Sequence, residues 1–151
     1  MEAVIFIGLQ GAGKSTFYRE YFLDSHIRIN LDMLKTRHRE KIIFEACLAA
    51  KQPLVIDNTN PTIEERAQYI KLAKHHKFKI VGYYFQAEVI DCQMRNQQRE
   101  LNKIVPLVGL RATAKKLVKP KQNEGFDQLF SVKIGANFSF KIHPWQDSNP
   151  Q

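Results

Sequence analysis

Residues 8–15 of the sequence read Gly-Leu-Gln-Gly-Ala-Gly-Lys-Ser and fill every fixed position of the phosphate-loop pattern G-x-x-x-x-G-K-[ST]. An apolar run at residues 3–7 precedes them and is typical of a buried parallel strand, while residues 16–22 can continue as a helix. In that context the backbone N–H groups of the loop turn toward a polyphosphate, and the helix N-terminus adds its positive dipole end. The stretch therefore predicts binding of a nucleoside triphosphate.

The polar groups of this loop each have an expected task. Lys14 reaches the β- and γ-phosphates and takes part in catalysis, and the hydroxyl of Ser15 ligates Mg²⁺. The sequence shows no [NT]KxD guanine-reading motif, so ATP is the expected triphosphate. The predicted cofactors are ATP and Mg²⁺, and the predicted cofactor-binding residues are Gly8, Gly11, Ala12, Gly13, Lys14, Ser15 and Thr16.

Asp32 follows a short extended segment at residues 27–29, where a parallel sheet would place it beside the phosphate loop. As a catalytic residue it would accept a proton from a hydroxyl that attacks the γ-phosphate. As a structural residue it would cap the N-terminus of the following helix, a task that Asp performs well. The two roles are compatible, and the sequence leaves both open.

Asp57 directly follows the apolar run at residues 54–56, as an acidic residue of the Walker B type does. One interpretation is that it holds Mg²⁺ through a water molecule or orients the acceptor of the phosphate. The other is an Asx turn that closes the strand, helped by Asn58. Both interpretations put Asp57 at the same edge of the sheet as Asp32.

Arg95 and Arg99 lie four residues apart in a helix-like segment that is polar on nearly every face. That spacing places both guanidinium groups on one face of the helix. They would clamp the ATP phosphates as a lid and neutralise charge in the transition state. A solvated helix face with two arginines is the alternative, and the spacing does not decide between them.

The elements that position these residues alternate between buried strands and helices. This order predicts βαβ units, and hence a three-layer α/β fold of the P-loop type with a mainly parallel sheet and helices on both faces. We expect strands at residues 3–7, 27–29, 54–56 and 79–85, helices at 14–22, 32–51, 60–75 and 87–101, and one or two late strands within 131–142. The long helix would bury a stripe of Leu34, Ile42, Ile43, Ala46, Leu48 and Ala49.

Length and composition are those of an ordinary globular chain. The 151 residues predict one P-loop kinase domain over 1–151, with a helical lid at about 87–118 and a mobile tail at 147–151. No apolar run approaches the ~18 residues of a membrane span, and the N-terminus lacks the basic region of a signal peptide. These features predict a cytoplasmic protein without a membrane partner, in which Cys47 and Cys92 are buried, reduced thiols.

The formal net charge is +8, from 23 Lys and Arg against 15 Asp and Glu. Such a balance favours an anionic partner beyond the nucleotide, and the backbone of a nucleic acid is the one we expect. A merely solubilising surface is the alternative interpretation of the same charge.

Taken together, these motifs resemble the kinase domain of polynucleotide 5′-hydroxyl kinases, particularly the kind joined to a 3′-phosphatase in DNA-repair enzymes. The resemblance covers nearly the whole chain in the right order, and the run at residues 56–61 is its most distinctive part. The matching residues are the phosphate loop through residue 17, Asn30-Leu31-Asp32, Ile56-Asp57-Asn58-Thr59-Asn60-Pro61 with Arg66 and Tyr69 beyond it, Arg95-Asn96-Gln97-Gln98-Arg99, Val105-Pro106, Lys119-Pro120 and Glu124-Gly125-Phe126.

The resemblance implies ATP-dependent phosphorylation of a 5′-hydroxyl on DNA or RNA. It makes Asp32 the general base and either Arg95 or Arg99 the lid arginine, and it brings the last matching segments near the nucleotide base. The acceptor-binding residues that it implies are Lys35, Asp57, Asn58, Thr59 and Arg66. The family often has an arginine where this chain has Lys35, and a lysine cannot make the bidentate fork of a guanidinium.

Two other functions fit the same loop. A kinase of a small metabolite or nucleoside would use the same scaffold with a different acceptor. A nucleotide-binding regulatory ATPase would transfer the phosphate to no acceptor, and Asp32 would then be only a helix cap.

Overall fold

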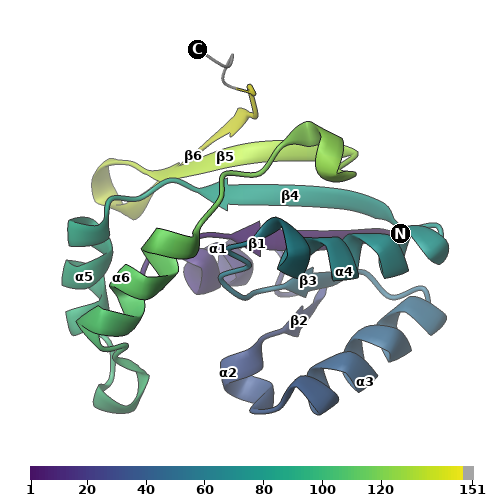
Figure 1. Ribbon diagram of the computed structural model, residues 1–151, viewed down its shortest axis with the longest axis horizontal. Helices are drawn as coiled ribbons and strands as arrows, with labels where there is room; N and C mark the ends of the chain where they lie inside the picture. The colour runs from purple at the N-terminus through teal and green to yellow at the C-terminus, as the bar shows by residue number, and fades with distance from the viewer. Residues whose placement is uncertain (148–151) are drawn as a thin grey trace.

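The computed structural model of the chain describes residues 1–147, which are built on a six-stranded sheet in the order β2-β3-β1-β4-β5-β6 (Figure 1). All neighbouring strands from β2 to β5 pair in parallel, and only β6 runs antiparallel against β5. The predicted mainly parallel sheet is confirmed. The strands are β1 (Glu2–Ile7), β2 (Ile27–Ile29), β3 (Leu54–Ile56), β4 (Lys79–Phe85), β5 (Gln128–Ile134) and β6 (Phe140–Pro144).

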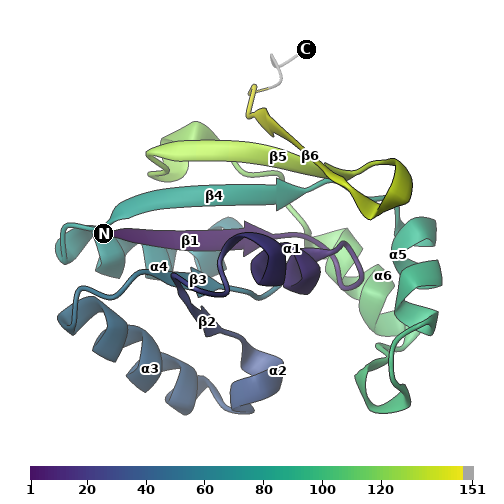
Figure 2. The same ribbon diagram turned by 180° about the vertical axis from the view of Figure 1, so that it is seen from behind.

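Helices cover both faces of this sheet, as the sequence predicts. Alternate residues of β1 point to opposite faces, so that Ile5 belongs to one apolar core and Phe6 to the other. α4 (Ile63–His75) covers the face that is toward the viewer in Figure 1 and α1 (Lys14–Tyr21) the opposite face, which Figure 2 brings forward. The remaining α-helices are α2 (Leu31–Leu34), α3 (Arg37–Ala49), α5 (Val89–Gln97) and α6 (Leu107–Lys116).

The long helix predicted at residues 32–51 is wrong, because two helices with a break between them replace it. Lys35 has a left-handed φ of 74° at the end of α2, and the Thr36 side chain then caps α3 by accepting a hydrogen bond from the Arg39 N–H at 3.1 Å. The break rotates the following residues, so Ile42 and Ile43 of the predicted stripe are 51% and 38% exposed.

Differences also occur after residue 97, where α5 ends earlier than the predicted helix at 87–101. α6 (Leu107–Lys116) forms a second helix inside the predicted lid segment. The late strands are β5 and β6, so two strands occupy a wider stretch than residues 131–142. Residues 148–151 of the predicted tail lie outside the described residues.

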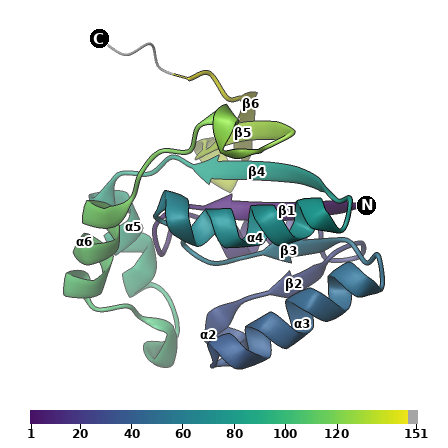
Figure 3. The ribbon, with the colours of Figure 1, turned by 45° about the vertical axis from the view of Figure 1, so that its right-hand side comes forward.

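The carboxyl ends of the parallel strands meet at one edge of the sheet, and α5 and α6 stand beyond that edge (Figure 3). α2 begins at the same edge, directly after β2 (Figure 3). In such sheets this is the edge where ligands bind. Both cysteines are free and buried, and in residues 1–147 no helix combines the length and apolar character that a membrane span needs.

Candidate active site at the carboxyl edge of the sheet

The phosphate loop joins β1 to α1 and requires glycine at two of its positions. Gly11 and Gly13 have φ angles of 79° and 97°, a region that side-chain-bearing residues rarely adopt. A Cβ atom on Gly11 would lie 2.6 Å from the carbonyl oxygen of Cys92, so α5 also packs directly on the loop. Gly13 is the N-cap of α1 and no side chain bonds to this helix end, which leaves the first-turn N–H groups available for an anion.

The remaining predicted cofactor-binding residues surround the start of α1. Gly8 and Ala12 are buried, whereas the side chains of Ser15 and Thr16 are exposed at the mouth of the loop. The Gly8 N–H donates to the carbonyl oxygen of Thr59 at 3.0 Å, so the segment after β3 holds the base of the loop. The Asn60 side chain adds a second tie by donating to the carbonyl oxygen of Phe6 at 2.7 Å.

Lys14 is buried at the centre of this edge. Its ammonium group donates to two carbonyl oxygens of its own loop, those of Gly8 at 2.9 Å and Leu9 at 2.6 Å. Burial lowers the pKa of Lys14 to about 8, a shift that the nearby charge of Asp57 partly opposes. The charge of Arg99 lowers this pKa further and that of Asp32 raises it, so both groups lie within electrostatic range of the ammonium.

Ser15 and Asp57 face each other across the loop. The Ser15 hydroxyl donates to Asp57 Oδ2 at 3.2 Å, and the Asp57 side chain is only 1% exposed. Hydroxyl and carboxylate oxygens are the hard ligands that Mg²⁺ prefers, so these residues fit the ion. In residues 1–147 no group of three His, Cys, Asp or Glu side chains forms a denser metal site.

Asp32 lies in the first turn of α2, with its side chain exposed. Asn30, not Asp32, caps this helix, because the Asn30 side chain accepts from the Met33 N–H at 2.9 Å. The prediction of Asp32 as a helix cap is therefore wrong. The same Asn30 side chain donates to the carbonyl oxygen of Asp57 at 2.6 Å, so α2 is tied to the end of β3.

Asn58 ties α2 to the same segment from a second point. Its side-chain oxygen accepts from the Leu31 N–H at 2.9 Å, next to Asp32, and its amide donates to Glu40 at 2.9 Å. Glu40 is buried, and it also accepts from the Tyr69 hydroxyl at 2.6 Å. This network fixes the end of β3 against α2, α3 and α4, and it leaves the exposed side chains of Asp32 and Lys35 on its rim.

Arg95 and Arg99 do not share a helix face, because α5 ends at Gln97 and Arg99 lies beyond it. Arg95 Nε donates to the carbonyl oxygen of Gly11 at 2.6 Å, which commits this side chain to supporting the phosphate loop. Arg99 is half-buried and its charge acts on Lys14. Of the two predicted lid arginines, Arg99 is the one whose charge acts on the pKa of Lys14.

Arg66 does not belong in the predicted acceptor-binding set. Its side chain is 0% exposed and forms an ion pair with Glu124, with Nε 2.8 Å from Glu124 Oε1. It also donates to the carbonyl oxygen of Asn60 at 2.9 Å. A guanidinium enclosed in this way supports the segment after β3 from inside, and it offers no surface to an acceptor.

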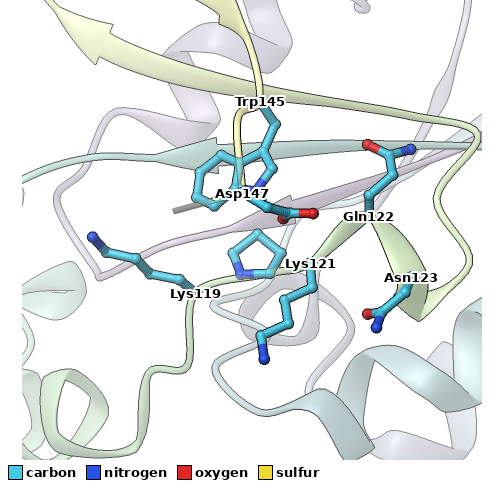
Figure 4. A pocket seen from close by; sticks show the side chains of 7 residues that line it. Lys119, Lys121, Gln122, Asn123, Trp145 and Asp147 are labelled. Carbon is cyan, nitrogen blue, oxygen red and sulfur yellow. Dashed lines mark hydrogen bonds between the residues drawn. The ribbon is translucent and has the colours of Figure 1, made fainter. Parts of the chain in front are cut away.

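The C-terminal segment carries a cavity of about 450 Å³ that is separate from the phosphate loop (Figure 4). Trp145 and Asp147 lie on one side of it and Lys119 and Lys121 on the other (Figure 4). A Cβ on Gly13 would lie 3.2 Å from Phe140, the first residue of β6, whereas Trp145 follows the last one. The cavity therefore lies at the far end of β6 from the loop.

Two residues of the candidate site were not predicted from the sequence. Arg28 contacts both Ser15 and Asp57, and Glu40 anchors Asn58. One indication of Arg28 was present in the sequence, because it is the single charged residue in the otherwise apolar strand Ile27–Ile29. Glu40 had no signal, because its burial depends on how α3 packs after the break at Lys35.

The chain is similar in sequence to known proteins. Residues 4–120 match the protein family described as the AAA domain. The chain is 30% identical over 136 residues to a bifunctional polynucleotide phosphatase/kinase of Schizosaccharomyces pombe, covering 87% of this chain and 33% of that protein. The chain thus spans about a third of the length of the curated relatives that it matches.

Solved structures share the fold at low sequence identity. A gluconokinase from Sinorhizobium meliloti 1021 superposes with a TM-score of 0.61 at 15% identity, over 91% of this chain and 85% of its own. Kti12 of Chaetomium thermophilum, solved in complex with ADP-AlF3, gives a TM-score of 0.66 at 17% identity, over 87% of this chain and 88% of its own. These two similarities establish the P-loop fold and no more.

Proposed function

Since the chain belongs to the AAA domain family and has the P-loop kinase fold, we propose that it transfers the γ-phosphate of ATP to the 5′-hydroxyl of DNA or RNA. The observation that carries the proposal is the position of Asp32. Its carboxylate is exposed on α2 and acts electrostatically on the phosphate-loop lysine. The helix that carries it is tied to the segment after β3 through Asn30 and Asn58. The similarity to a polynucleotide phosphatase/kinase supplies the acceptor class.

The donor half of the reaction would use the loop and Arg99. The first-turn N–H groups of α1 and the Lys14 ammonium would hold the β- and γ-phosphates. Arg99 would neutralise charge that develops on the transferred group, and Arg95 would keep the loop in place through Gly11. Mg²⁺ held by Ser15, and by Asp57 through water, would supply further charge neutralisation on the phosphate oxygens.

On the acceptor half, the oxygen of the 5′-hydroxyl would attack the γ-phosphorus while Asp32 accepts the proton of that hydroxyl. The bond between the γ-phosphorus and the β–γ bridging oxygen would break, and ADP would leave. Lys35 would contact the acceptor's phosphodiester as a point charge. Asp57, Asn58 and Thr59 would line the wall between the two halves. The net charge of +8 is consistent with a polyanionic acceptor whose binding weakens as salt is raised.

The test is transfer of radiolabelled γ-phosphate from ATP to a 5′-hydroxyl oligonucleotide. Asp32→Asn should slow the transfer by about 100-fold or more, because general-base catalysis contributes roughly that much, while ATP affinity stays within about twofold. Asp24→Asn, at an exposed aspartate in the turn before β2, is the matched control and should keep full activity.

Three outcomes would overturn the proposal. Full-rate labelling by Asp32→Asn would show that Asp32 is not the general base. ATP consumption that ignores every acceptor would indicate a regulatory ATPase, and phosphorylation of small hydroxyl compounds in preference to oligonucleotides would indicate a metabolite kinase.

A further inference from the structure

Arg28, on β2, places its guanidinium between the two residues expected to hold the metal ion. Its Nε donates to Asp57 Oδ2 at 2.7 Å, and its Nη2 donates to the Ser15 hydroxyl at 2.9 Å. The pair is tied together by the Ser15–Asp57 hydrogen bond of 3.2 Å. One planar cation thus spans both oxygen ligands, a geometry that suits the guanidinium fork.

The contact has an evident electrostatic cause. The Asp57 carboxylate is almost fully enclosed, and a buried carboxylate requires a charged or hydrogen-bonding partner. Arg28 supplies one while keeping 27% of its own side chain exposed, so it has a path toward solvent. The ring of Tyr18 lies 6.0 Å from the Arg28 guanidinium carbon and offers a cation–π surface beside that path.

A divalent cation bound at Ser15 and Asp57 would lie against the positive guanidinium of Arg28, and two positive charges at that range repel each other. We propose that Arg28 competes with Mg²⁺ for Ser15 and Asp57, and that its guanidinium must leave these oxygens before the metal–nucleotide complex binds. Arg28 is a positioning residue in this scheme: it holds the two ligands in place until the metal replaces it. The inference rests on the proposed Mg²⁺·nucleotide site and does not depend on the acceptor.

The opposite role for Arg28 predicts an effect of opposite sign. If the guanidinium only kept Ser15 and Asp57 oriented for the metal, its removal would weaken metal binding. If it competes, its removal strengthens metal binding, because no cation has to be displaced. The direction of one measured affinity therefore distinguishes the two.

The experiment measures Mn²⁺ binding to the full chain in the presence of ADP, by the paramagnetic resonance signal of free Mn²⁺. Arg28→Gln should lower the Mn²⁺ dissociation constant about fivefold or more, the usual scale of coupling between two bound states. Lys79→Gln removes one exposed positive charge at the opposite end of the sheet and should change it less than twofold. An unchanged or raised constant in Arg28→Gln would overturn the proposal.

Two further measurements sharpen the test, and the first keeps it decisive if Arg28→Gln folds poorly. Arg28→Lys keeps the charge but cannot span both oxygens, so its Mn²⁺ affinity should fall between those of wild type and Arg28→Gln. Arg28→Gln should also gain more in Tm from MgADP than wild type gains, and an equal or smaller gain would contradict competition. If wild type binds no metal–nucleotide complex, this inference and the proposed function both fail, whereas absent transfer with intact Mn²⁺ competition defeats only the proposed function.

Discussion

The two halves of the candidate active site are built in different ways. On the donor side, the phosphate loop is bonded to the segment after β3 and pressed against α5, and Lys14 is buried among carbonyl oxygens. On the proposed acceptor side, Asp32 is exposed on α2 and Lys35 is exposed directly after it, and α2 itself has no buried residue. The proposed donor side consists mainly of backbone groups and packed side chains. The proposed acceptor side consists of exposed side chains at a short helix, which Asn30 and Asn58 hold in place.

This difference explains where specificity can change without loss of nucleotide binding. The phosphate loop tolerates little substitution at its glycines, because a Cβ atom would lie 2.9 Å from its neighbour at Gly8 and 2.6 Å at Gly11. The exposed end of α2 can accept new side chains as long as Asn30 and Asn58 still hold it. Substitutions on the two sides should therefore separate nucleotide affinity from transfer.

The largest expected effect concerns the two arginines. Arg99→Ala should slow phosphate transfer by about 1,000-fold, the lower scale for an arginine that neutralises the transferred phosphoryl group, with Tm nearly unchanged. Arg95→Ala should instead weaken ATP binding and lower Tm, because the Gly11 carbonyl loses its partner. Single-turnover rates and ATP titrations of both variants check this, and reversed roles would refute the assignment of Arg99.

On the acceptor side, Asn58→Ala should slow transfer by about 30-fold, while ATP affinity stays within about twofold. It removes the bond to the Leu31 N–H and leaves Glu40 without one partner, a loss of about 2 kcal/mol in the placement of α2. Asn123→Ala, at an exposed asparagine beside the cavity that is separate from the phosphate loop, is the matched control. Equal losses in ATP affinity and in transfer would show that the two sides are not separable.

The pH dependence of nucleotide binding tests the donor side. The pKa of Lys14 is about 8 because of burial, and a bound polyphosphate favours the charged ammonium. ATP affinity should thus be nearly constant below about pH 7 and fall by up to tenfold between pH 8 and 9, with proton uptake on binding. Calorimetry in buffers of different ionisation enthalpy measures that uptake, and Lys14→Met should show none from this group.

The smallest expected effect is a gain. Lys35→Arg should tighten binding of a 5′-hydroxyl oligonucleotide about threefold, since a guanidinium can make a bidentate contact with a phosphodiester. ATP affinity should not change. The KM for the oligonucleotide checks this, and an equal gain with a small hydroxyl acceptor would argue against a phosphodiester at Lys35.

The sequence predicts the donor side better than the acceptor side, for a physical reason. The phosphate loop is a local motif: its glycines, its lysine and its flanking elements are contiguous, so pattern alone places them. Arg28 and Glu40 act through contacts with residues that are distant in the chain, and no periodicity reports such contacts. The break between α2 and α3 occurs at Lys35, which has a positive φ although it is not a glycine, and the sequence gives no sign of this.

The same distinction applies to the fold. Buried strands at residues 3–7, 54–56 and 79–85 were predictable as continuous apolar runs. The segment after residue 101 was harder, because α6 has only one buried residue, Leu110, and therefore a weak apolar stripe. The burial of Arg66 was hidden for a related reason: its partner, Glu124, lies far along the chain.

The contacts of Asn96 set the two arginines apart. Its buried amide donates to the Val105 carbonyl oxygen at 2.6 Å and accepts from the Val105 N–H at 3.0 Å, which closes the loop of residues 97–104 at its neck. Arg99 is carried on that loop, while Arg95, on the other side of the neck, is fixed to the phosphate loop. One asparagine thus divides the two arginines between separate structural units: Arg95 belongs to the support of the phosphate loop, and Arg99 to a loop that is closed on itself.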